Sequence, residues 1–341
     1  MFVPQQKKGT MTQTINPNMI LLARESRGFS QSVLAEKLNS YKANVSRLEH
    51  GDTAVDDEVL IALSEATNYP PHFFLQKGEI LPVNLSYRKR KNVPAKLITP
   101  IEAQMNIIRR HVHTITGAME QARPELPLYK VDETNTPEKI ATLVRKKWNM
   151  PAGAVENLSK ILEERGIIIS SFDFGTDRVD SRSMLTDDNY PIIFLNKNLL
   201  GDRQRFSLAF ELGHLIMHTF CIVPHETDIN HEANLFAAEF LMPAKDILKD
   251  FKEGITLSLL GELKRKWKVS MIALLYRADD LGLLTANQKR YLVQQFNDQK
   301  IRRREPQQLD VPKENPQLMR RLLADFMSKT KLGVIQLCTV L

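Results

Sequence analysis

Hydrophobic residues recur every three to four positions along most of this chain, a spacing that predicts helices. Two regions carry the pattern densely enough to bury a core, residues 16–77 and residues 136–285. The second region also holds short apolar runs that are typical of strands. These expected strands are residues 167–170, 183–185 and 191–196. The pattern therefore predicts an α+β protein that is mostly helical, with an all-α N-terminal domain and a second domain built around a small sheet.

The remaining parts of the chain are more polar. Residues 78–135 form an expected basic and helical connector, with one amphipathic helix at 101–121, and residues 286–341 form a polar, basic C-terminal tail. No apolar run approaches the roughly 20 residues of a membrane-spanning helix, and no apolar stretch follows the first lysines. Two distant cysteines cannot build a disulfide framework. We therefore expect a cytoplasmic protein with no membrane partner.

Helix start and stop signals divide residues 16–51 into three short helices. The second and third are joined by Asn39-Ser40-Tyr41, and Asn39 tolerates the left-handed backbone that such a turn needs. Val33 in the second helix and Ile61 in a fourth are assigned to the core. Two short helices joined by a turn of three to four residues match the geometry of a DNA-reading motif.

The third helix carries polar residues opposite its apolar face. Lys42, Asn44 and Arg47 lie there. Lysine and arginine suit the acceptors of guanine, and asparagine suits the paired donor and acceptor of adenine. The net charge of +7 is compatible with nucleic acid. Double-stranded DNA is the predicted partner, and the alternative is a helical module that binds proteins or dimerises.

The string R-x-x-R-G-F-S-Q-S-x-L-A-E-K-L, followed by V-S-R-L-E-H-G, resembles the XRE (lambda-repressor-like) family of helix-turn-helix proteins. The resemblance covers most of the first domain and implies a transcription regulator that binds an operator. It implies that five residues lie near DNA, with the first and last beside the backbone: Gln31, Lys42, Ala43, Asn44 and Arg47. Such modules usually read two half-sites, so we expect a homodimer.

One helix of the second domain, within RQRFSLAFELGHLIMHTF, combines an apolar pattern with a polar stripe. Glu211, His214 and His218 are spaced i, i+3 and i+7, so they share one face. Buried polar groups need partners, and a metal ion is one solution. The zinc peptidase signature H-E-x-x-H uses two histidines as ligands and the glutamate as base. Here Phe210 occupies the position of the first histidine.

A third ligand has two candidates on the next helix, Glu232 and Glu239. They are seven residues apart and therefore lie on one side of that helix. Either could point toward the polar stripe, and the residues alone do not distinguish them. His218 is one helical turn from His214 and is the residue that could replace the lost ligand.

The string R-Q-R-F-S-L-A-F-E-L-G-H-L-I-M-H, together with H-E-A-N-L-F-A-A-E-F-L-M-P, resembles the ImmA/IrrE family of zinc metallopeptidase-like proteins. The resemblance implies a zincin-like fold with Glu211 as general base, His214 as a zinc ligand and Glu232 as the third ligand. It also implies a prokaryotic regulator of stress, mobile-element or phage-related genes. Because phenylalanine cannot bind metal, the H-E-x-x-H helix is degenerate, and we expect zinc to be weakly held or absent.

Three functions remain open from the sequence. The first is a DNA-binding transcription regulator whose metallopeptidase-like domain is a catalytically impaired sensor or effector. The second is an active zinc metallopeptidase that cleaves a repressor or itself, so whether the chain is an enzyme stays undecided. The third is an antitoxin or immunity-type protein that binds a partner such as a toxin. The phenylalanine at position 210 favours the first.

Overall fold

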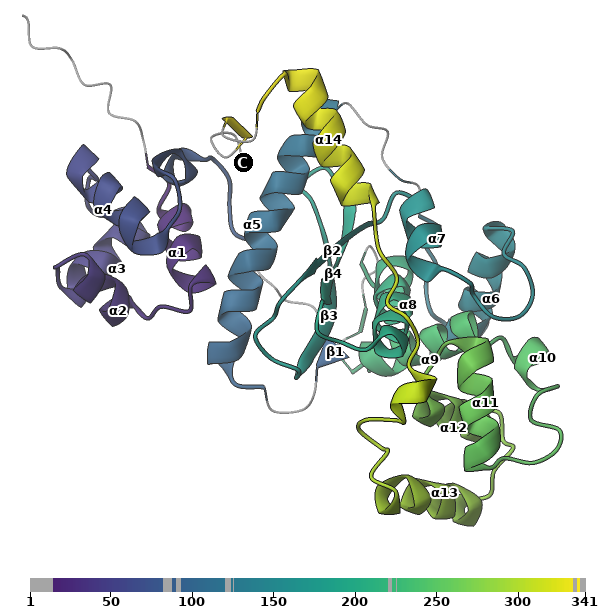
Figure 1. Cartoon of the computed structure of the whole chain (residues 1–341). Coiled ribbons are helices and arrows are strands. Elements are labelled where there is room, and N and C mark those ends of the chain that lie inside the picture. The colour runs from purple at the N-terminus through teal and green to yellow at the C-terminus, as the bar shows by residue number, and fades with distance from the viewer. Residues whose placement is uncertain are drawn as a thin grey trace, which may run out of the picture. The chain divides into compact units, whose positions relative to one another are not determined.

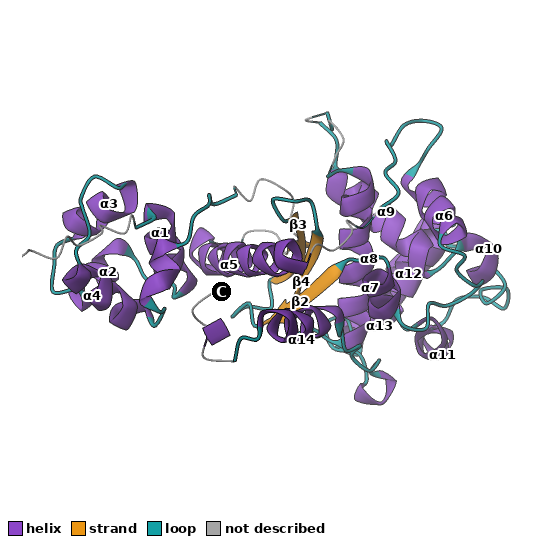
Figure 2. Ribbon diagram, turned by 90° about the horizontal axis from the view of Figure 1, so that it is seen from above, coloured by secondary structure: helices purple, strands orange, loops and turns teal. Residues whose placement is uncertain are grey.

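A computed structural model of the chain shows a mostly helical protein with one small sheet, which confirms the predicted α+β class (Figures 1 and 2). The structure describes residues 15–81, 88–89, 93–119, 124, 126–219, 223–224, 226–333 and 336–337. The chain divides into two compact units, the first made of residues 1–83, 94–114 and 327–341, the second of residues 84–93 and 115–326. Within the described residues, no helix has both the length and the apolar character to cross a membrane.

The first unit begins with a bundle of short helices around a small core. They are α1 (Pro17–Ser26), α2 (Gln31–Lys37), α3 (Lys42–His50), α4 (Asp57–Thr67) and the 3₁₀ turn η1 (Pro71–Leu75). Asn16 caps α1 through the N–H of Asn18, and Ser30 caps α2 through the N–H of Val33. The core joins buried side chains from each helix: Met19, Leu22, Leu34, Val45, Leu63 and Phe74.

The turn between α2 and α3 takes the predicted form. Asn39 has a left-handed backbone with φ of 48°, and the N–H of Ser40 donates to the carbonyl of Ala35. Two core predictions were wrong, because the Val33 side chain is 39% exposed and that of Ile61 is 54% exposed. The buried faces of these helices are centred on other positions, with Leu34 and Ala35 buried in α2 and Leu63 in α4, so Val33 and Ile61 point toward solvent.

The helix predicted in the connector starts earlier than expected, as α5 (Ala95–Met119). Two of its buried side chains, Ala103 and Ile107, join the core of the first unit. The Asn106 amide donates to the carbonyl of Leu81, and its oxygen accepts from the N–H of the same residue. These contacts make residues 95–114 part of the first unit rather than a free linker.

The second unit contains the sheet and most of the helices. Its elements are β1 (Arg88–Lys89), α6 (Pro137–Lys147), α7 (Leu158–Glu164), β2 (Ile168–Phe172), β3 (Val179–Leu185), β4 (Pro191–Asn196), α8 (Gly201–Met217), α9 (Ile229–Leu241), α10 (Ala244–Ile247), α11 (Leu257–Trp267), α12 (Met271–Asp280), α13 (Ala286–Asp298), η2 (Gln307–Leu309) and α14 (Leu318–Thr330). The strand order is β1-β3-β4-β2. Strands β2 and β4 are parallel, and β3 runs antiparallel to both of its neighbours.

Strand β3 begins at Val179, four residues before the start predicted from hydrophobicity. Its first half is polar, yet Asp180, Ser181, Arg182 and Ser183 are all buried. Such side chains interrupt an apolar strand pattern, and they are stable inside a protein only when they have polar partners. The partners of Asp180, Ser181 and Ser183 come from α8, which packs directly against this strand.

Helix α8 lies at the centre of the second unit and is buried on nearly all sides. It packs against β3, β4, α7 and α9, so an apolar stripe on one face would not describe it. Helix α9 approaches closely at Gly213, where an added Cβ would lie 3.1 Å from Cδ1 of Phe236. This close approach brings the polar stripe of α8 next to the side chains of α9.

Candidate functional site

The outer face of α3 holds the residues predicted to contact DNA. Lys42, Ala43, Asn44 and Arg47 are all exposed, whereas Val45 and Leu48 on the opposite face are buried. The Asn44 amide donates to the Ser40 hydroxyl at 3.0 Å, a local contact that limits its rotamers. The helix therefore presents two cations and an amide to solvent from a rigid support.

Tyr41, directly before α3, is a residue that the sequence reasoning did not select. Its side chain is 80% exposed, which is unusual for an aromatic residue of this size. It stands at the N-terminal end of the helix, beside Lys42. The sequence indicated this residue only by placing a large aromatic side chain at the end of the turn, directly before α3.

Gln31 sits at the first position of α2 and is half-buried. Its amide Nε2 donates to Oε2 of Glu49 at 2.8 Å, and the Arg24 guanidinium pairs with Oε1 of the same carboxylate at 2.5 Å. One residue each from α1, α2 and α3 thus forms a linked network. Its contacts position α2 against α3, and the predicted role of Gln31 beside the DNA backbone stays a prediction.

The polar stripe of α8 begins with Glu211, which is 1% exposed. Ser181 donates to its Oε1 and Ser183 to its Oε2, both at 2.8 Å. Burial raises the pKa of this carboxyl to about 7, against the lowering effect of the two serine hydroxyls and of the nearby Arg182. Glu211 is therefore partly protonated at neutral pH, and both of its oxygens are occupied by β3.

The histidines of α8 form a chain with Glu232 of α9. Nδ1 of His214 lies 2.9 Å from Nδ1 of His218, and Nε2 of His218 lies 2.8 Å from Oε2 of Glu232. Burial lowers the pKa of both rings, that of His214 to about 3, so both are neutral at pH 7. The carboxylate must accept from Nε2–H of His218, whose Nδ1 then accepts from Nδ1–H of His214.

These tautomers leave Nε2 of His214 without a proton. That atom is buried and has no hydrogen-bond partner of adequate geometry among the described residues. The Asn230 amide lies close enough to influence the His214 pKa, yet its buried Oδ1 is likewise unsatisfied. A neutral imidazole nitrogen in this state is a potential metal donor.

Phe210 lies where the signature has its first histidine. Its ring packs edge-on against His214, with 4.7 Å between ring centroids, and it is 1% exposed. A phenyl ring supplies no lone pair, so the position contributes packing and no ligand. The ring fills the space beside His214 that a second donor would need.

The two candidate glutamates of α9 have different surroundings. Glu239 forms a buried ion pair with Arg277 and accepts from the Thr142 hydroxyl and the N–H of Ala244. Its carboxylate is committed to these contacts with α6, α10 and α12. Glu232 alone of the pair contacts the α8 histidines, through His218.

The donors present do not fit a catalytic zinc ion. Such a site takes three protein ligands and a water. Among the described residues no group of three His, Cys, Asp or Glu side chains is placed to hold a metal. Both ring nitrogens of His218 and both oxygens of Glu211 accept or donate hydrogen bonds, which leaves Nε2 of His214 and the second carboxylate oxygen of Glu232, two donors where three are needed. His225 and Cys221, which follow α8 in the chain, lie outside the described residues.

A bundle of short helices with an exposed polar helix, and a buried pair of helices that carries a polar stripe, together define a two-part protein. The family models agree with this division. Residues 20–74 match the helix-turn-helix model, and residues 162–279 match the IrrE N-terminal-like domain of the M78 peptidases. Both resemblances found in the sequence are thereby confirmed. No curated protein matches the chain.

The sequence reasoning missed the partners of Glu211. Ser181 and Ser183 are two residues apart on β3, so both hydroxyls point to one side of the sheet. Their spacing is the only trace of this pocket in the sequence, and it has meaning only once the strand is known to face α8.

Proposed function

We propose that this chain is a DNA-binding transcription regulator whose peptidase-like domain senses or transmits a signal without hydrolysing peptides. The observation that carries the proposal is Phe210, packed against His214 in place of a metal ligand. The helix-turn-helix supplies DNA binding, as a homodimer on two half-sites in the cytoplasm. The second domain supplies a folded scaffold that retains the base and two of the three ligand positions of a peptidase.

The remaining polar residues support a closed network and not a hydrolytic centre. A peptidase base must contact the water that attacks the substrate. Both oxygens of Glu211 instead accept from serine hydroxyls. His214 is hydrogen-bonded to His218, and His218 is hydrogen-bonded to Glu232. We assign these residues to holding α8, α9 and β3 together.

Elemental analysis of the purified protein tests the loss of the metal site. We expect no stoichiometric zinc in the natural chain, because Phe210 leaves at most two of the three protein ligands, and up to about one equivalent in Phe210→His, which restores the signature. Phe206→His, one turn earlier on α8, is the matched control and should bind none. One tightly bound zinc in the natural chain, or a peptide product that Glu211→Gln abolishes, would overturn the proposal.

Selection from a random pool of double-stranded DNA tests the other half. We expect the full-length protein to enrich a defined sequence with two related half-sites, and to bind it less tightly as salt concentration rises. Binding that shows no sequence preference at any salt concentration would contradict the role as a regulator.

A further inference from the structure

The second unit contains a large cavity that the proposed function does not use. Its volume is about 1120 Å³, and it lies between the first turns of α8, helices α9 and α12, and the segment that follows α13. Small-molecule sites usually enclose roughly 300–1,000 Å³, so this one could hold a sizeable ligand. Glu211, His214 and His218 do not line it, which separates it from the polar stripe of α8.

Apolar side chains form a large part of the cavity wall. Phe206 comes from α8, Leu235 from α9, and Ile272, Ala273 and Tyr276 come from α12. Tyr276 is 39% exposed although it is aromatic. A wall of this kind favours a flat or hydrocarbon body over a fully polar ligand.

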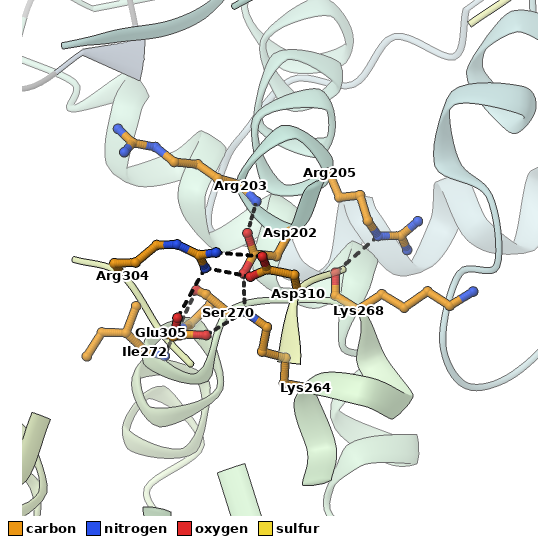
Figure 3. A network of polar contacts seen from close by, with 11 residues as sticks. Asp202, Arg203, Arg205, Lys264, Lys268, Ser270, Ile272, Arg304, Glu305 and Asp310 are labelled. Carbon is orange, nitrogen blue, oxygen red and sulfur yellow. Dashed lines mark hydrogen bonds and ion pairs between the residues drawn. The ribbon is translucent and has the colours of Figure 1, made fainter. Parts of the chain in front are cut away.

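Several charges near the cavity are neutralised within the protein. Arg203 makes two bonds to Asp180, at 2.8 and 2.6 Å. Lys264, 1% exposed in its side chain, pairs with Asp202 at 2.5 Å and with Glu305 at 2.6 Å (Figure 3). These groups fix the shape of the cavity and leave little charge for a ligand.

Three further cations line the cavity: Lys300, Arg302 and Arg303. Among the described residues none of them forms an ion pair, and Arg302 has one long contact, 3.5 Å to Oδ1 of Asn297. These three cations lie close together in sequence, on the segment after α13. The acidic residues Asp177 and Asp280 also line the cavity, but they come from other elements.

That segment is held in place by the residues that follow it. The buried Glu305 accepts from Nζ of Lys264 and from the N–H of Ile272, and Arg304 pairs with Asp310 at 2.5 Å (Figure 3). The backbone that carries the three cations is thereby tied to α11 and α12. A fixed backbone lowers the entropy that is lost when side chains close on a ligand.

We infer that this cavity binds an organic anion with an aromatic or apolar body. The body lies against Phe206, Ile272 and Tyr276, and the acidic group is met by Lys300, Arg302 and Arg303. Binding of such a ligand depends neither on DNA binding nor on the state of the metal site, so it can be tested independently of the proposed function.

Two fluorescent probes with the same ring system test the inference in the full-length protein. 8-Anilinonaphthalene-1-sulfonate carries an anionic group, and N-phenyl-1-naphthylamine lacks it. We expect the sulfonate to bind with a stoichiometry of one. The double variant Arg302→Ala/Arg303→Ala should weaken the sulfonate about tenfold and leave the neutral probe unchanged. Arg320→Ala/Arg321→Ala on α14 removes the same charge elsewhere and should change neither.

Filling the apolar wall provides the second arm. Ala273→Trp should weaken the binding of both probes. If thermal unfolding shows that this variant does not fold, Tyr276→Ala replaces it and should likewise weaken the binding of both probes. Equal affinity of the sulfonate for the natural chain and for Arg302→Ala/Arg303→Ala would overturn the inference. So would affinity for both probes that is unaffected by the folded wall variants.

Discussion

Glu211 shows how burial and neighbouring hydroxyl groups set the chemistry of a carboxyl group. In a peptidase its carboxylate would be ionised and would face a metal-bound water. Here it lies between Ser181 and Ser183, with a pKa raised to about 7 by burial. The surroundings of this carboxyl group are thus those of a buried structural residue and not those of a catalytic base.

This raised pKa gives a prediction for the pH dependence of stability. The unfolded chain releases the Glu211 proton near pH 4.5 and the folded chain near pH 7, so its contribution is full below pH 4.5 and is lost as pH rises through 7. The free energy of unfolding of the natural chain, minus that of Glu211→Gln, should fall by up to about 3 kcal/mol between pH 4 and pH 8. Urea unfolding at several pH values measures it.

The lowered pKa values of His214 and His218 have the opposite effect, because they reduce the free energy of unfolding as pH falls below 6.5. The natural chain and Glu211→Gln both keep these histidines, so the subtraction cancels this effect. Glu253→Gln, an exposed site, is the control and should show no such trend. A difference that is constant across the pH range would show that Glu211 is not a buried, proton-binding group.

At the scale of elements, α3 combines local and tertiary control. Its ends follow from the turn at Asn39 and from Gly51, whose φ of 78° and contact with Pro17 leave little room for a side chain. Its exposed face follows from the burial of Val45 and Leu48. The turn, Gly51 and the spacing of Val45 and Leu48 all lie within or beside the helix in sequence, which explains why these features could be predicted, whereas the contact with Pro17 is tertiary.

Substitutions on this face test its role. Asn44→Ala should cost about 1–3 kcal/mol on the selected DNA sequence, because a base-specific pair of hydrogen bonds is lost. Arg47→Ala should weaken selected and scrambled duplexes alike and lower the salt dependence by about one unit of slope. Fluorescence anisotropy at several salt concentrations separates the two effects.

A lysine of the second unit provides the matched control for these DNA measurements. Lys160→Ala removes an exposed charge in the second unit and should leave both affinities unchanged. If Arg47→Ala bound both duplexes as tightly as the natural chain, α3 would not be the DNA-reading helix.

At the scale of the whole molecule, much of the polar C-terminal region belongs to the second unit. Glu314 accepts from the N–H groups of Leu158 and Ser159 at the start of α7, and it pairs with Arg205 of α8. Glu163 in turn accepts from the N–H groups of Gln317 and Leu318. These carboxylates fasten a segment that the sequence describes only as polar and basic.

Removing the charge of Glu314 should lower the stability of the folded protein. Arg205 is 1% exposed, so Glu314→Gln leaves a buried guanidinium without its counter-charge. We expect the free energy of unfolding to fall by about 3–5 kcal/mol, measured by urea denaturation. Glu262→Gln, an exposed acid on α11, should change it by less than about 0.5 kcal/mol. A similar small effect for Glu314→Gln would show that the segment is held by other contacts.

The sequence by itself determined the helices of the first bundle and the caps of its first two helices, the exposed polar face of α3 and the phenylalanine at position 210. Each of these is encoded within a few turns of chain, by residue type and spacing. The tertiary structure decided that β3 is a buried polar strand and that Glu232 rather than Glu239 contacts the histidines. It also decided that Glu314 fastens the C-terminal segment to α7 and α8. The physical reason is that a buried polar group is defined by its partner, and these partners lie tens to hundreds of residues away along the chain.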